Sequence, residues 1–150
     1  MKSKAKEVNS FKCEFPSRSV NEGFARSVTA AFTAWLDPTF SDVCDIKTAV
    51  SEGVTNCIVH GYGNGNGTVY LSAKYYEDGL LVIRIKDKGK GIEDVKKAME
   101  PLFTTDKSGE RGGMGFAVMQ AFTDKLKVTS KPGKGTTLLM YKRLKAADDR

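Results

Sequence analysis

Hydrophobic positions recur along the chain with a period near two in some segments and near 3.6 in others. The shorter period predicts strands over residues 11–15, 69–76, 80–86, 125–130 and 136–143. The longer period predicts two helices, the first ending near Leu36 and the second running to Gly61. The apolar face of the first helix contains Phe24, Val28, Ala31, Phe32 and Trp35. That of the second contains Val43, Ile46, Val50, Val54 and Cys57.

Capping and turn residues sharpen these boundaries. Ser19 precedes Glu22 by three residues, the spacing of a capping box, and Ser41 is placed to cap the second helix. The residues 77–79, Glu-Asp-Gly, predict a hairpin turn, and the glycine- and asparagine-rich residues 61–67 predict a mobile loop. Two shorter helices are expected, one at residues 94–99 and one that begins at the glycines of residues 112–115.

The order is therefore strand, two helices, hairpin, helices, hairpin. Strands paired in hairpins, with helices gathered between them, predict an α+β fold rather than alternating βαβ units. We expect a two-layer α/β sandwich with a mixed, mainly antiparallel sheet and helices on one face. A single domain is expected over residues 1–150, with its core at about 11–143.

Composition narrows the function classes. The net charge is +6, but the basic residues are spread along the chain without an interleaved aromatic stripe, so no nucleic-acid partner is expected. The longest apolar runs are too short to cross a bilayer, which predicts no membrane association and a cytoplasmic protein. One histidine and three scattered cysteines argue against zinc, and Cys13, Cys44 and Cys57 are expected to be reduced packing residues.

Common nucleotide and hydrolase motifs are missing. The chain has no G-x-x-x-x-G-K-[ST], no G-x-G-x-x-G after a strand, no H-R-D loop and no G-x-S-x-G. These absences argue against P-loop, Rossmann, eukaryotic-type kinase and serine hydrolase chemistry.

A three-part pattern remains. Glu52 and Asn56 share one face of the second helix with His60; Asp87-x-Gly89-x-Gly91 follows a buried strand; and 113–115, Gly-Met-Gly, opens a helix. Each part has an ordinary alternative, as a solvated helix face, a turn or a loop. Their combination in this order resembles the N, G1 and G2 boxes of the GHKL ATPase and kinase superfamily.

Longer stretches resemble the family of bacterial sporulation anti-sigma F factors over roughly residues 11–143. The similar segments are Asn21-Glu22-x-Phe24-Ala25-Arg26, Leu36-Asp37-Pro38-Thr39, Val50 to Asn56, His60-Gly61-Tyr62, Pro101 to Thr105 and Gly113 to Phe116. This resemblance implies a Bergerat-type ATP-binding fold, a serine protein kinase activity, and ATP or ADP with Mg²⁺ as ligands.

The resemblance assigns the adenine end of the nucleotide to Asp87, whose carboxylate would accept from the adenine amine. Gly89 and Gly91 would allow the backbone to approach the base and ribose closely. Thr136 would join this pocket through its hydroxyl, although a β-branched strand residue is an equally ordinary reading.

The phosphate end is assigned to other residues. Asn56 would hold Mg²⁺, and the helix start formed by Gly113, Met114, Gly115 and Phe116 would bind phosphate oxygens. The segment carrying Thr104, Thr105, Lys107 and Arg111 would close over the phosphates, with Arg111, and Lys107 beside it, neutralising the γ-phosphate. For both cations a solvated loop charge is the alternative. Glu52 would act as general base.

Partners also follow from the resemblance. They are a sigma factor, which the protein inhibits, and an anti-anti-sigma factor, which it phosphorylates on serine; Arg26 is expected to be exposed and to contact both. A homodimer is expected as well. The alternatives are a general-stress anti-sigma serine kinase, a stand-alone histidine-kinase-like ATP-binding domain, and a module that binds ATP without catalysis.

Overall fold

The computed structural model describes residues 2–100 and 114–144. Its strands are β1 (Glu7–Pro16), β2 (Thr68–Tyr76), β3 (Leu80–Asp87), β4 (Lys125–Lys131) and β5 (Gly135–Arg143). Its α-helices are α1 (Asn21–Phe32), α2 (Phe40–Thr55), α3 (Val95–Ala98) and α4 (Gly115–Ala121). A 3₁₀ segment, η1 (Thr33–Leu36), extends α1, and a π-helical segment, η2 (Asn56–Gly61), extends α2.

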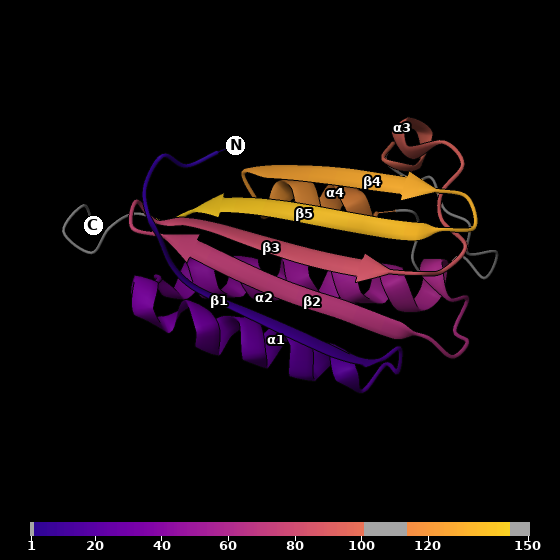
Figure 1. Ribbon diagram of the computed structural model, residues 1–150, viewed down its shortest axis with the longest axis horizontal. Helices are drawn as coiled ribbons and strands as arrows, with labels where there is room; N and C mark the ends of the chain where they lie inside the picture. Colours follow the sequence, from indigo (N-terminus) through magenta and orange to yellow (C-terminus); the bar gives the residue numbers. More distant parts are fainter. Residues whose placement is uncertain (1, 101–113, 145–150) are drawn as a thin grey trace.

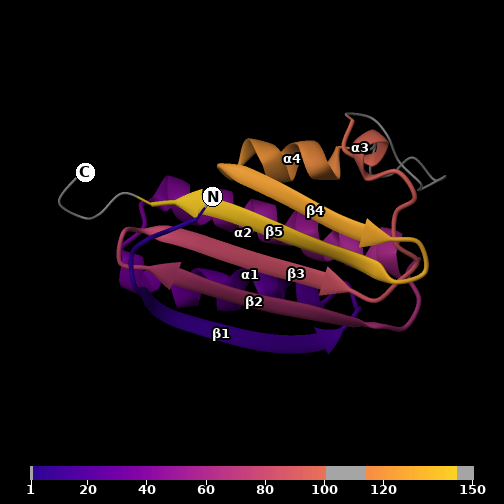
Figure 2. The ribbon, with the colours of Figure 1, turned by 45° about the horizontal axis from the view of Figure 1, so that its top comes forward.

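The strands form one sheet in the order β1-β2-β3-β5-β4, and every pairing among the described residues is antiparallel. Helices α1, α2 and α4 lie against the same face of this sheet (Figures 1 and 2). The expected α+β two-layer sandwich is therefore confirmed, with a sheet that is antiparallel rather than mixed in this part of the chain.

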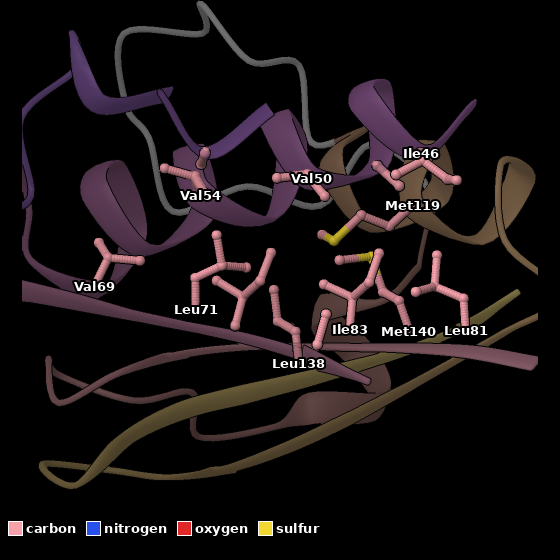
Figure 3. Packing of buried hydrophobic residues seen from close by; sticks show 14 of the residues in the cluster. Ile46, Val50, Val54, Val69, Leu71, Leu81, Ile83, Met119, Leu138 and Met140 are labelled. Carbon is pink, nitrogen blue, oxygen red and sulfur yellow. The ribbon is translucent and has the colours of Figure 1, made fainter. Parts of the chain in front are cut away.

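The core lies between α2 and the sheet. Figure 3 shows Ile46, Val50 and Val54 of α2 pointing at the strand side chains, with Met119 of α4 beside them. The strand residues that meet them are Val69, Leu71, Leu81, Ile83, Leu138 and Met140, all nearly or fully buried. The alternation of buried and half-buried residues along β2 explains why its period of two was a reliable strand signal.

Helix α1 differs from the expectation. Its fully buried positions are Ala25 and Thr29, followed by Thr33 in η1, whereas Phe24 and Trp35 are 50% and 62% exposed. The two aromatic rings pack on the first two strands of the sheet: Phe24 meets Phe15 of β1, and Trp35 stacks on Tyr75 of β2. Small residues occupy the buried line because α1 packs closely against α2.

The predicted caps are also corrected. Val20 is the N-cap of α1 and no side chain caps it, because Glu22 bonds Arg26 and Thr55 instead of completing a box with Ser19. The N-cap of α2 is Thr39, two residues before Ser41: Thr39 and Asp42 form its capping box, with bonds of 3.0 and 3.1 Å. Cys44 is exposed and is not a packing residue.

The hydroxyl of Thr29 is buried, and no hydrogen-bond partner for it lies in residues 2–100 or 114–144. Because an unpaired buried hydroxyl carries its desolvation cost, Thr29→Val is expected to raise the free energy of unfolding by about 1 kcal/mol in urea titrations. Thr33→Val is the matched control, since Thr33 is equally buried but donates to Ala30 O at 2.8 Å. It should lower stability, and equal effects of the two changes would contradict the assignment.

No helix among residues 2–100 and 114–144 combines the length and the apolar composition that a membrane span requires.

Candidate functional site

The carboxylate of Asp87 lies at the end of β3, completely buried. Its Oδ1 atom accepts from the N–H of Gly89 at 2.9 Å and from the N–H of Thr136 at 3.3 Å. These bonds fix the carboxylate plane from two directions, the loop that follows β3 and the neighbouring strand β5. Its Oδ2 atom is buried with no hydrogen-bond partner among the described residues.

Burial raises the pKa of the Asp87 carboxyl above its ordinary value, and the bonds from Gly89, the Cys57 thiol and Thr136 offset part of this rise. The pKa of the neighbouring Cys57 thiol is also raised well above its ordinary value, mainly by burial and further by the charge of Asp87. The Asp87 carboxyl thus combines a raised pKa with a buried oxygen that lacks a hydrogen-bond partner among the described residues. Such an oxygen is suited to accept a hydrogen bond from a ligand.

Glycines let the backbone close around this carboxylate. A Cβ on Gly61 would lie 2.6 Å from Asp87 Oδ2, and one on Gly89 would overlap the carbonyl of Gly61. Gly91 has a φ of +74°, and a side chain there would meet the carbonyl of Lys131. Glycine at 61, 89 and 91 therefore has a steric basis in contacts within the protein, and the approach of Gly89 and Gly91 to a base and ribose stays a prediction.

Thr136 lies opposite Asp87 in the β3–β5 register and is 4% exposed. Its hydroxyl is 2.8 Å from that of Ser130, which donates to Gly135 O at 2.9 Å and accepts the Ile92 N–H at 2.8 Å. Since Ser130 gives its one proton to Gly135, the Thr136 hydroxyl donates to Ser130 and keeps lone pairs for another donor. The structure thus brings Thr136 and Asp87 together.

Helix α2 leads from this pocket to the proposed phosphate end. It changes at Asn56 into the π-helical segment η2, marked by the bond from Tyr62 N–H to Cys57 O at 2.9 Å. The expected line of Glu52, Asn56 and His60 assumed an α-helical period, which ends at Asn56. Asn56 is buried and Glu52 is half-buried. Gly61, which touches Asp87, follows Glu52 by more than two helical turns.

The second element that is predicted to bind phosphate lies partly within the described residues. Helix α4 begins at Gly115, and its N-cap Met114 makes no side-chain capping bond. Its first N–H groups therefore lack a side-chain acceptor at the cap, which suits an anionic ligand. Thr104, Thr105, Lys107, Arg111 and Gly113 lie outside the described residues.

Arg26 lies on α1, away from Asp87. Its side chain is 41% exposed and bonds Glu22 at 2.9 Å and the Ser51 hydroxyl at 3.1 Å. Arg26 was expected to be simply exposed, but these bonds hold its side chain in place. They join α1 to α2 beside Glu52.

Comparison with known proteins places this geometry in a family. The model of the histidine kinase-like ATPase domain matches residues 15–142. A protein of Caldanaerobacter subterraneus named anti-sigma F factor is 56% identical over 89% of this chain and 93% of its own length. A Thermoanaerobacter protein of the same name is 55% identical over 90% and 94%. The chain belongs to the anti-sigma F factor family. The resemblance seen in the sequence is thereby confirmed, and its family is a nucleotide-binding one.

A solved structure of the RsbU and RsbW domains of a Mycobacterium tuberculosis protein supports the fold. It superposes with a TM-score of 0.66 at 20% identity, covering 91% of this chain and 33% of that one. The chain thus spans about a third of that protein's length, and at this identity the likeness shows the fold alone.

The sequence did not predict the contributions of several residues near Asp87 and Thr136 in this anti-sigma F factor family member. Cys57 packs in the core as expected, but its influence on the pKa of Asp87 was not expected; Gly61 was expected only to end a helix, and Ser130 had no expected role. Gly61 stood in the matched segment with His60 and Tyr62, which was a usable signal. Ser130 carried none, because its role depends on the register of β4 with β5.

Proposed function

We propose that the chain is a single ATP-binding kinase domain that inhibits a sigma factor and phosphorylates a serine of an anti-anti-sigma factor. The supporting observation is the buried Oδ2 of Asp87, which has no partner among the described residues and is surrounded by closely packed glycines. An exocyclic amine of adenine would give that oxygen the donor it lacks, in a charge-assisted hydrogen bond. Thr136 has lone pairs available for a second contact.

Phosphate groups would extend from this pocket along α2. Asn56 offers a side-chain carbonyl to Mg²⁺, and the described residues contain no cluster of acidic, histidine or cysteine side chains that could hold the ion alone. A Mg²⁺ ion bound mainly by phosphates, water and one amide fits this donor set, and it would neutralise charge during transfer. The α4 start, with Arg111 and Lys107 from the segment before it, is proposed to bind the remaining oxygens.

Glu52 is the proposed general base. Its carboxylate would take the proton of the serine hydroxyl as the serine oxygen bonds to the γ-phosphorus and the bond to the ADP oxygen breaks. Glu52 is one turn before Asn56, which is consistent with the order adenine, metal and γ-phosphate along α2.

Relatives named anti-sigma F factor support a sigma factor as the partner, and a cytoplasmic location suits such a partner. Arg26 is proposed as a contact shared by the sigma factor and the anti-anti-sigma factor, so that the two compete. A homodimer is also proposed. The face of the sheet without helices, which carries a hollow lined in part by Val82, Leu139 and Tyr141, is available to a second copy.

The activity is tested by incubating the full chain with Mg-ATP and a candidate anti-anti-sigma protein. Mass spectrometry is expected to find phosphoserine on that protein, and chelating Mg²⁺ should abolish the transfer. Acid-labile phosphate on histidine, or no transfer at all, would contradict a serine kinase.

A further inference from the structure

Tyr62 bridges two segments that meet at the candidate site. Its hydroxyl donates to the carbonyl of Thr68, the first residue of β2, at 2.6 Å. The same oxygen accepts the backbone N–H of Lys88 at 2.7 Å. The hydroxyl therefore uses both its donor and its acceptor capacity to join the start of β2 to the residue directly after Asp87.

The residues after β3 depend on this bridge. The Asp87 loop, residues 87–91, turns back so that Gly89 N–H reaches Asp87 Oδ1 at 2.9 Å, while Lys90 N–H donates to Gly61 O at 2.9 Å. The Lys88 peptide lies within this turn, and its N–H is oriented by Tyr62. Two residues of the loop, Lys88 and Lys90, are thus held by Tyr62 and by Gly61 at the end of η2, and Gly89 between them is held by Asp87.

The Tyr62 ring is itself fixed. Gly67 packs directly on the ring, so that a Cβ at this position would overlap it. The loop between η2 and β2 is tied to Ser17, whose N–H donates to Gly67 O and whose hydroxyl donates to Gly65 O, each at 2.9 Å. This loop, expected to be mobile, is therefore bound to the end of β1 and supports the ring.

We propose that Tyr62 is a positioning residue for adenine recognition, acting through the Lys88 peptide on the orientation of the Asp87 carboxylate. This inference rests on the proposed binding of ATP at Asp87. Tyr62 has no polar atom left for the nucleotide, so its effect is confined to what Asp87 recognises, the exocyclic amine. Phosphate binding, which involves α2 and α4, should not depend on it.

The test compares Mg-ATP with the Mg complex of purine riboside triphosphate, which lacks the exocyclic amine. By calorimetry, wild-type protein should bind ATP more tightly than the analogue. Tyr62→Phe removes both hydrogen bonds of the bridge. It is expected to weaken ATP binding roughly 5- to 10-fold, which is the scale of the hydrogen bond between the adenine amine and Asp87, and to leave the affinity for the analogue unchanged. The KM for ATP should rise while kcat stays the same, because the transfer machinery is untouched.

A second variant guards against simple misfolding. Gly67→Ala keeps the hydroxyl but displaces the ring, and it should produce the same selective loss. Tyr75→Phe is the matched control, because it also removes a bonded hydroxyl, which accepts from Asn9 at 3.4 Å, but at the end of β2 that pairs with Leu81, far from Asp87; it should change neither affinity. Equal losses for ATP and the analogue, or no loss, in Tyr62→Phe would overturn the inference. A wild-type protein without preference for ATP would instead overturn the proposed Asp87 contact.

Discussion

Asp87→Asn is expected to lower the affinity for ATP roughly 10- to 100-fold, measured by calorimetry at neutral pH. The substitution keeps Oδ1, which accepts from Gly89 and Thr136, and replaces the unpaired Oδ2 by an amide donor. A donor then faces the donor amine of adenine, so the charge-assisted bond is lost and a repulsive contact replaces it. Unchanged affinity would contradict the adenine contact.

The same variant should be more stable than the wild-type protein without nucleotide. Burial raises the folded-state pKa of Asp87, so the folded protein holds this proton more tightly than the unfolded chain does. The ionised carboxylate therefore costs stability above that pKa, and the cost disappears as the pH falls through it. Asp87→Asn removes the charge, and its apo melting temperature at neutral pH should rise.

This combination separates a binding defect from damage to the fold. Asp78→Asn, at the opposite end of β3, is the matched control, since Asp78 is exposed and pairs with Arg143 at 2.9 Å. It should leave ATP affinity unchanged and should not raise the melting temperature. A protonated Asp87 presents a donor to the adenine amine. The ATP affinity of the wild-type protein should therefore decline as the pH falls, and this decline should begin at a higher pH than it would for a carboxyl with an ordinary pKa.

The strands and their turn could be predicted because each signal was local. Strands β2 and β3 alternate or run apolar around Glu77-Asp78-Gly79, and both formed within one or two residues of the expected bounds. The face of α1 could not be predicted in the same way. Phe24 and Trp35 are more hydrophobic than Ala25 and Thr29, so hydrophobicity alone predicts that the two aromatic side chains are buried. Helix α1 instead packs so closely against α2 that only small side chains fit between the two helices.

The site shows the same division. Asp87, Gly89 and Gly91 lie within five residues, so the sequence motif alone could predict a shared role for them. The contributions of Cys57 and Ser130 depend on a π-helical turn and on the β4–β5 register, which arise from tertiary packing. The positions of Lys107 and Arg111 lie outside the described residues, so their roles remain predictions.

Glu52→Gln is expected to leave ATP affinity within about twofold of wild type while lowering the transfer rate ~10²- to 10⁴-fold. The amide preserves the size of the side chain on α2 but accepts a proton far less readily. Measurement requires the rate of phosphate transfer at saturating Mg-ATP together with calorimetric affinity, so that binding and chemistry are separated.

The matched control for Glu52→Gln is Glu14→Gln, which removes one carboxylate from an exposed position on β1 and should change neither quantity. A Glu52→Gln protein with a normal transfer rate would exclude Glu52 as the base, without affecting the adenine contact at Asp87. A large loss of affinity would instead assign Glu52 to ground-state binding, since a base contributes mainly in the transition state. The two substitutions are therefore expected to have different effects: Asp87→Asn weakens ATP binding, and Glu52→Gln slows phosphate transfer.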